Sequence, residues 1–348
     1  MTQARPGQLV PEAQAILEAS PIRAAPIVQI DPPEHTRLRS SITRALSGQR
    51  IAALEPRLRG FCDRLIDGFE PRGRADFMAD FAHPYPIMVI GSLLGVPEAD
   101  FPDLLRLSDE HLALVYAEVP PSEQARHAQS TLELHRYIFG MAERRRLAPG
   151  DDLISDLFRS VEAGQASLSS DEVASMLYVV LLAGFETTIK LLGNCLLALL
   201  AERRHWQAIV DDPARIPAVV EEVLRFDGPV LCTIRMTRED VDLGGTAIPA
   251  GSRVQVLMAS ANHDQAVFPE GEAFDPSRER PAGHLGFGFG VHFCIGAPLA
   301  RLETRVALEQ LARRLPRLRL VPDQQLEYKA NLILRGLSRL LVEWDATM

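Results

Sequence analysis

The sequence predicts a mainly α-helical protein with small β-sheets, and three features support this fold class. Residues 51–150 read as several amphipathic helices that are separated by prolines. Residues 169–204 form one long pattern that is apolar on nearly every side, as expected for a helix buried in a large core. After Pro229, apolar and polar residues alternate between glycine-containing turns, which is typical of short hairpins.

The composition limits the kinds of protein that this chain can be. It has 348 residues, of which 47% are hydrophobic and 24% are charged, as in ordinary globular proteins. A net charge of −9 argues against a general role in binding nucleic acid. The four cysteines are scattered without pairing logic, and the first residues show no apolar leader or anchor. We therefore expect a cytoplasmic protein without a membrane segment.

The first part of the chain is weakly patterned until a helix start at Asp31-Pro32-Pro33. Residues 11–19 fit a short helix, and residues 21–30 look extended. Prolines after Asp31 suit the first turn of a helix. On that helix His35 and Arg39 stand four residues apart and share one face. Taken alone, such a pair is typical of a solvated face.

The long helix of residues 169–204 carries polar residues at its centre. Ser170 is the expected N-cap, with acidic residues in the turn that follows. Glu186 and Lys190 argue against a membrane-spanning role, because each would cost about 3 kcal/mol inside a bilayer. Thr187 and Thr188 have two interpretations. They belong to a self-satisfied kink, in which a hydroxyl bonds to a carbonyl one turn earlier, or they are used in function.

Residues 283–301 contain one cysteine, Cys294, in a loop of glycines and phenylalanines that opens directly into a helical pattern. Backbone N–H groups and the helix dipole at a helix start favour a thiolate and lower the pKa of a thiol. With no second cysteine nearby, a zinc or iron–sulfur site is not expected. Two interpretations remain, which are a buried structural cysteine and the axial ligand of a haem iron.

The loop around Cys294 resembles the haem-binding loop of the cytochrome P450 family. The matching pattern is Phe287-Gly288-x-Gly290-x-His292-x-Cys294-x-Gly296. Five sequence elements that resemble those of the family occur in the family's order over residues 31–345. This resemblance implies the cytochrome P450 fold, a triangular α-rich domain around a buried haem. It also implies haem b (iron protoporphyrin IX) as cofactor, with Cys294 as the ligand of the iron.

The resemblance also assigns expected roles to other residues. The segment DPPEHTRLR resembles one whose histidine and arginine contact haem propionates, and carboxylates require cationic donors. Residues 183–188 resemble the oxygen-activation motif, with Glu186 and Thr187 as catalytic residues and a role for Gly184 in leaving room over the iron. The expected cofactor-binding residues are His35, Arg39, Ala183, Gly184, Arg235, Phe287, Gly288, His292, Cys294 and Gly296.

Two further sets of residues follow from the resemblance. Glu222 and Arg225 share a helix face and resemble the family's E-x-x-R element, with Arg278 as the third member of a structural network. Residues 101–146 are expected to form two helices and a loop over the substrate cavity. The residues expected to line that cavity are Val180, Leu231, Cys232, Ile234 and Leu332.

The sequence departs from the family pattern at its N-terminus. Only 30 residues precede Asp31, so we expect a short divergent segment (1–30) before one haem-thiolate catalytic domain (31–348). We expect an N-terminal helix and strands of the family to be missing or replaced. We therefore expect an unpaired edge at the strand near residues 253–257, which favours a homodimer. We also expect a cavity that is open on the N-terminal side.

Together these features predict a haem-thiolate mono-oxygenase. It would hydroxylate or epoxidise a small apolar substrate, in a biosynthetic pathway. Electrons would come from a separate ferredoxin and ferredoxin reductase that dock near Arg37, Arg44 and Arg301. The alternatives are a haem-binding or recruitment protein without turnover, and an enzyme that uses the haem for oxidative coupling. The sequence assigns no role to Lys190.

Overall fold

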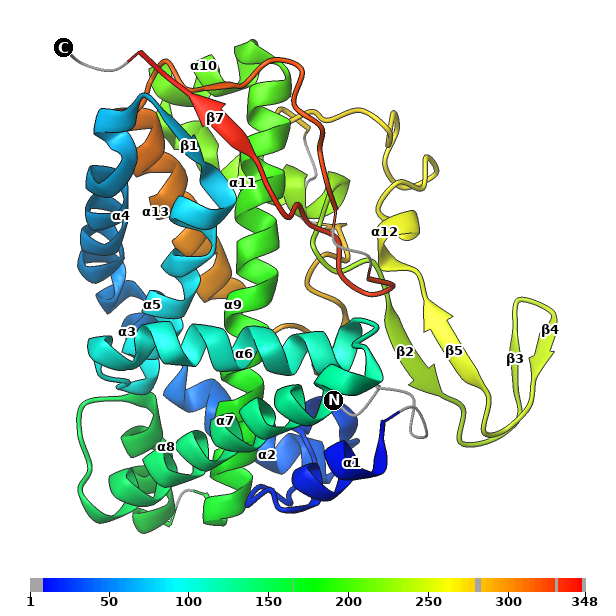
Figure 1. The fold of residues 1–348 in the computed structure, drawn as a ribbon. Helices are drawn as coiled ribbons and strands as arrows, with labels where there is room; N and C mark the ends of the chain where they lie inside the picture. The colour runs from blue at the N-terminus through cyan, green and yellow to red at the C-terminus, as the bar shows by residue number, and fades with distance from the viewer. Residues whose placement is uncertain (1–8, 165, 279–282, 329–330, 346–348) are drawn as a thin grey trace.

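A computed structural model describes residues 9–164, 166–278, 283–328 and 331–345. A helical body surrounds one long central helix, α9 (Ser170–Ala201), and small sheets lie at its margins (Figure 1). The other long helices of the body are α4 (Glu55–Phe69), α6 (Phe101–Tyr116), α7 (Pro121–Leu147) and α13 (Ala297–Arg314). The shorter helices are α1 (Pro11–Glu18), α2 (Glu34–Ala45), α3 (Gly48–Ala53), α5 (Pro84–Leu94), α8 (Leu153–Glu162), α10 (Arg203–Asp211), α11 (Ile216–Phe226) and α12 (Met258–Ala261).

Helix α9 forms the axis of the core, as its apolar sequence predicts. Ser169, rather than the expected Ser170, is its N-cap, and it forms a capping box with Glu172. Both serines suit a cap, but only Ser169 stands three residues before a glutamate, as the box requires. Helices α5, α7 and α13 pack directly against α9. By length and composition α9 could cross a membrane, yet 72% of its most apolar window is buried inside the protein.

Three small antiparallel sheets complete the described part of the chain. Their strands are β1 (Arg74–Asp76), β2 (Thr233–Met236), β3 (Val241–Leu243), β4 (Thr246–Ile248), β5 (Arg253–Val256), β6 (Arg319–Leu320) and β7 (Leu341–Glu343). Strand β7 lies between β1 and β6, β2 pairs with β5, and β3 pairs with β4. The β3–β4 hairpin confirms the turn predicted at Gly244-Gly245, where both glycines have positive φ. Strands β2 to β5 project from one side of the helical body (Figure 1).

The N-terminal segment packs against the body. Helix α1 confirms the short helix expected there, and it contacts α7. The segment 21–30 is not fully extended, because Ile27–Gln29 forms a single 3₁₀ turn. Strand β5 pairs with β2, and no described residue of the first 30 is paired with β5. The homodimer stays a prediction, as does the division of the chain at residue 30.

Candidate functional site

A cavity of about 590 Å³ lies between α9 and the loop that contains Cys294. All the residues that we expected to bind a cofactor or to act in catalysis line this cavity. They are His35, Arg39, Ala183, Gly184, Glu186, Thr187, Arg235, Phe287, Gly288, His292, Cys294 and Gly296. The 3₁₀ turn Ile27–Gln29 lines it too. The expectation of a cavity open on the N-terminal side stays a prediction, with this turn forming part of the wall.

The cysteine loop is held by its own backbone. Gly288 and Gly290 have φ angles of +72° and +73°, a conformation that L side chains rarely adopt. The amide of Cys294 donates to the carbonyl of Phe287 at 2.9 Å. Helix α13 begins at Ala297 directly after this loop, with Gly296 as its N-cap. The sulfur of Cys294 thus lies at a helix start, as the sequence predicted.

The charge state of Cys294 differs from the expectation. Burial raises the pKa of its thiol, while hydrogen bonds from the backbone of Gly296 and Ala297 and the charge of Arg39 act in the opposite direction. The expected net lowering of the pKa is therefore wrong for the protein alone, because loss of hydration outweighs the helix start. The surrounding amides and guanidinium are nevertheless placed to stabilise a thiolate.

Basic side chains gather at one end of the cavity. The rings of His35 and His292 lie 4.3 Å apart, and burial lowers the pKa of both imidazoles. Arg39 donates to the carbonyl of Phe293 at 2.6 Å. Arg235 donates to the hydroxyl of Thr233 at 2.7 Å. Neutral imidazoles and two guanidinium groups that line a cavity are suited to binding carboxylates.

Helix α9 contributes polar residues to the lining of the same cavity. The hydroxyls of Thr187 and Thr188 donate to the carbonyls of Ala183 and Gly184, at 2.7 and 2.9 Å. These are the hydrogen bonds expected if each hydroxyl binds a carbonyl one turn earlier. The kink expected with them is absent here, because α9 continues through this region without a break. Thr187 also lines the cavity, and its use in function stays a prediction. Lys190 forms an ion pair of 2.9 Å with Glu186.

Gly184 has a packing role that the sequence did not indicate. A Cβ atom at this position would lie 2.9 Å from Cδ1 of Ile90 on α5. Such a contact is too close for a normal side chain, so a larger residue would require the side chain of Ile90 to shift. Gly184 also lines the cavity. Its expected role in leaving room over the iron stays a prediction.

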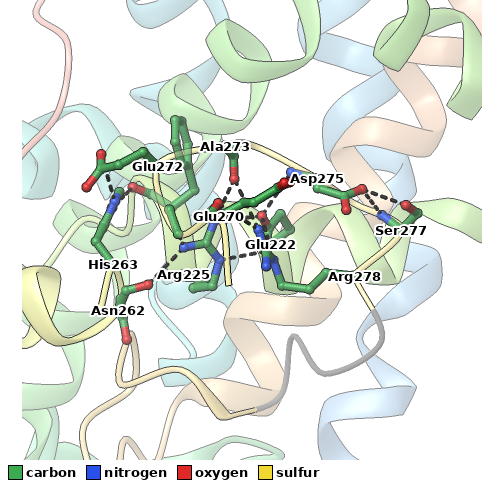
Figure 2. A network of polar contacts seen from close by, with 12 residues as sticks. Glu222, Arg225, Asn262, His263, Glu270, Glu272, Ala273, Asp275, Ser277 and Arg278 are labelled. Carbon is green, nitrogen blue, oxygen red and sulfur yellow. Dashed lines mark hydrogen bonds and ion pairs between the residues drawn. The ribbon is translucent and has the colours of Figure 1, made fainter. Parts of the chain in front are cut away.

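The predicted network behind the cysteine loop is present (Figure 2). Arg225 binds Glu222 through two hydrogen bonds of 2.8 Å, and both side chains are fully buried. The remaining donors of Arg225 reach the carbonyls of Asn262, Gly271 and Ala273. Arg278 approaches Glu222 to 3.5 Å. The network thus fixes the chain around residues 262–278, which precedes the cysteine loop.

Comparisons with known proteins agree with this geometry. The family model described as Cytochrome P450 matches residues 215–338. The Cytochrome P450 monooxygenase PikC of Streptomyces venezuelae is 40% identical over 91% of this chain and 76% of its own length. The 6-deoxyerythronolide B hydroxylase of Saccharopolyspora erythraea is 40% identical over 90% of this chain and 77% of its own length. The chain belongs to the cytochrome P450 family.

A solved structure supports the same assignment. The cytochrome P450 CREJ, in complex with (4-ethylphenyl) dihydrogen phosphate, superposes with a TM-score of 0.91 and 36% identity, over 97% of this chain and 84% of that chain. The predicted P450 fold is therefore confirmed. Like the family, this cytochrome P450 is a monooxygenase and binds haem. The alternative of a haem-binding protein without turnover does not hold.

The cavity residues fit a haem. A haem needs one axial ligand, donors for its two carboxylates and an apolar enclosure. Cys294, the basic end with Arg39 and Arg235, and the apolar side chains along α9 supply these three features. Within the described ranges, no group of three or more metal-ligating side chains exists. The donor set therefore suits a haem-thiolate site of the cytochrome P450 type.

Two of the expected substrate-lining residues lie elsewhere in this P450. Val180, Cys232 and Ile234 line the cavity, but Leu231 and Leu332 do not. The amide of Leu231 donates to the carbonyl of Ile333, and this extended segment turns alternate side chains to opposite sides. Leu231 lines a second cavity, and Leu332 is 81% exposed. Their neighbours Val230, Ile333 and Leu334 line the first cavity instead.

Sequence reasoning missed two acidic groups near the cysteine. Glu221 pairs with Arg301 at 2.5 Å and with His284 at 3.1 Å. Burial would raise the pKa of Glu221, but these two partners lower it to about 2. Arg301 also lies over the ring of Phe287, 4.6 Å from its centroid. The only signal for Glu221 in the sequence was its position directly before the E-x-x-R element.

The second acidic group is Glu303, which lines the cavity while fully buried. Burial raises the pKa of its carboxyl.

The basic residues that we expected to attract a ferredoxin are partly neutralised. Arg37 forms ion pairs with Glu34 and Glu172, and Arg301 pairs with Glu221. Each of these arginines therefore adds less positive charge to the surface than the sequence implied. The docking position of an electron donor stays a prediction.

Proposed function

We propose that this cytochrome P450 inserts one oxygen atom of O₂ into a small apolar substrate, by hydroxylation or epoxidation. The observation that carries the proposal is the position of the cavity. Cys294 and the Glu186-Thr187 pair line the same cavity, and apolar residues such as Val180 and Leu182 line the space along α9. An apolar molecule held there would face both the cofactor and a source of protons.

In this proposal the basic end of the cavity orients the haem. Arg39 and Arg235 would bind its two carboxylates, with His35 and His292 beside them, and Cys294 would ligate the iron. When bound, the haem supplies the activation of O₂ and the transfer of one oxygen atom. Gly296 and Ala297 would direct their amides to the ligating sulfur and tune its electron donation.

Thr187 and Glu186 of α9 would transfer protons in this site. Thr187 holds its hydroxyl at the cavity through its bond to the carbonyl of Ala183. Glu186 lines the same cavity and would deliver protons as a general acid.

The relatives support the proposed class of reaction and of pathway. They include 6-deoxyerythronolide B hydroxylase and the Mycinamicin IV hydroxylase/epoxidase of Micromonospora griseorubida. We therefore propose a small apolar molecule of a biosynthetic pathway as the substrate. The proposed electron donors are a ferredoxin and its reductase, in the cytoplasm.

The absorption spectrum of the reduced protein under carbon monoxide tests the site. A strongly red-shifted Soret band in the wild type, and its loss in Cys294→Ser, is the expected result. A band that persists in Cys294→Ser would contradict thiolate ligation by this residue. A screen for substrate-induced spin shifts then selects compounds for turnover.

Turnover with a ferredoxin system tests the reaction. The expected product contains one oxygen atom from ¹⁸O₂. A product in which two parts of the substrate are joined without added oxygen would instead support oxidative coupling. Turnover that needs only peroxide would contradict the proposed electron supply.

A further inference from the structure

Glu186 belongs to a polar stripe that runs along α9. Glu186, Lys190 and Asn194 are spaced four residues apart, so they follow one another on the same side of the helix. Most of α9 around them is apolar and buried. Lys190 is 6% exposed and Asn194 is 1% exposed. A buried lysine and a buried asparagine are costly in a core unless they are satisfied or used.

Lys190 lies behind Glu186, away from the haem cavity. Its ammonium pairs with Glu186 at 2.9 Å, but Lys190 is not among the residues that line this cavity. Its aliphatic stem packs on Gly336, where an added Cβ would lie 2.7 Å from Cβ of Lys190. Glu186 is the one hydrogen-bond partner of its ammonium among the described residues. Two of the three donors of this ammonium therefore remain for water.

Asn194 leads from Lys190 to a second cavity of about 620 Å³. Its amide nitrogen donates to the carbonyls of Asp227, at 2.7 Å, and Arg335, at 3.5 Å. Its amide oxygen is buried, and no described residue donates a hydrogen bond to it. Asp227 and Arg335 line this second cavity together with Asn194. An unpartnered amide oxygen at such a wall is suited to holding a water molecule.

The two cavities are neighbours. Val230 lines both of them, while Glu186 lines only the first and Asn194 only the second. Lys190 stands between these two residues in the stripe, and Gly336 next to Arg335 covers it. The stripe thus places three polar side chains one turn apart between the two cavities, with Glu186 at the first cavity and Asn194 at the second.

We propose that Lys190 and Asn194 are positioning residues that supply protons to Glu186 from the second cavity. Lys190 gives one proton to the Glu186 carboxylate and takes one from a water molecule held at Asn194, and this water regains a proton from solvent through the second cavity. Glu186 then releases one proton into the haem cavity. No bond between heavy atoms changes, and the net result is one proton moved from solvent to the haem cavity. This inference rests on the proposed function of Glu186 as the acid of the site.

The test uses the haem-loaded protein and needs no knowledge of the substrate. The chemically reduced protein is mixed with oxygenated buffer in H₂O and in D₂O, and the rate of peroxide formation is measured. This reaction takes its electrons from the reductant and its protons from the protein. In Lys190→Met and Asn194→Leu we expect the rate to fall about 100-fold, the low end for loss of a proton donor. The solvent isotope effect should increase, because proton supply becomes limiting.

Matched variants separate proton supply from damage to the fold. Lys190→Arg keeps a cation on the stripe and should recover most of the rate. Leu197→Met changes an apolar residue of the second cavity and should behave as the wild type. Glu186→Gln combined with Lys190→Met should lose no more than Glu186→Gln alone, because both act on one path. Asn194→Ser, which keeps a small polar side chain, serves if Asn194→Leu does not fold.

Three results would overturn the proposal. They are a folded Lys190→Met variant with the wild-type rate, a folded Asn194→Leu or Asn194→Ser variant with no change in isotope effect, and losses that multiply when Glu186 and Lys190 are both changed. If the proposed function is wrong but this inference is right, the wild type would oxygenate no substrate. Peroxide formation would still slow when Lys190 or Asn194 is substituted.

Discussion

Two acid–base pairs in the core of this P450 differ in how completely they are satisfied. Arg225 uses its donors on Glu222 and on three backbone carbonyls, and both side chains are fully buried. Lys190 makes one contact with Glu186, and both side chains keep some exposure. The first pair has one well-defined arrangement, whereas the second can exchange its contact for water. A pair that must hold a loop in place benefits from the first design, and a pair that must move protons benefits from the second.

The largest expected effect of this difference is on stability. Arg225→Met would leave the Glu222 carboxylate buried with only the amide of Asp275, at 2.9 Å, and Arg278, at 3.5 Å, as partners. We expect the free energy of unfolding to fall by about 3–5 kcal/mol. Urea titration of the haem-loaded protein would measure this fall, and haem content would report on the cysteine loop.

Arg278→Met is the matched control for this prediction. Arg278 bonds mainly to backbone carbonyls of Pro269 and Glu270 and keeps 13% of its side chain exposed. It should therefore cost less stability than Arg225→Met. If the two variants proved equally stable, the central position that we give to Arg225 would be wrong.

The sequence predicted the local parts of this site well. The glycines before Cys294 and the helix directly after it depend on neighbouring residues, so their pattern carries the information. The Gly244-Gly245 hairpin and the length of α9 follow from equally local rules. The resemblance to the P450 family added the order of the elements and the partner of Glu222.

Contacts between distant segments were not readable from the sequence. Leu231 faces away from the haem cavity because its backbone pairs with Ile333, about 100 residues later. Lys190 had no assigned role, since its packing partner Gly336 lies on another segment. The pKa of Cys294 was misjudged because burial, which depends on the whole fold, outweighs the helix start. In each case the deciding neighbour is remote in sequence.

A third buried polar cluster, around His111, consists of uncharged side chains. It extends the comparison because its contribution to stability depends on pH. His111 contacts Tyr178 at 2.7 Å and Thr131 at 3.2 Å, where α6, α7 and α9 meet. Burial lowers the pKa of His111 to about 3 and that of His135 to about 4. Below pH 6.5 the unfolded chain therefore binds protons that the folded protein does not.

The contribution of these two histidines to the free energy of unfolding should therefore be fully present above about pH 6.5. It should be lost as the pH falls toward 4, by on the order of 1 kcal/mol per pH unit for each histidine. Urea titrations between pH 7 and pH 4.5 would measure this fall. The double variant His111→Gln/His135→Gln should show a flatter dependence. Tyr178→Phe removes one hydrogen bond but keeps both buried imidazoles, so its slope should remain that of the wild type. An unchanged slope in the double variant would show that other groups govern the acid response.

The smallest expected effect concerns the pair that has the fewest contacts. Lys190→Met keeps an unbranched stem that can pack on Gly336 and removes the ammonium. Glu186 lines a cavity and can be solvated there, so it is not left in a fully apolar place. We expect a loss of about 1–2 kcal/mol, between the values of exposed and buried ion pairs.

A double-mutant cycle of Glu186→Gln and Lys190→Met isolates the interaction within this pair from the packing of each side chain. Urea unfolding of the four haem-loaded proteins should give a coupling of about 1 kcal/mol. The corresponding cycle of Glu222→Gln and Arg225→Met should give a larger value, because both of those side chains lose all hydration in the folded state. Equal couplings would mean that the number of hydrogen bonds does not separate the two pairs. A Lys190 that is strongly coupled to Glu186 would also be too tightly held to exchange protons, so a small value is the result that a proton-carrying pair requires.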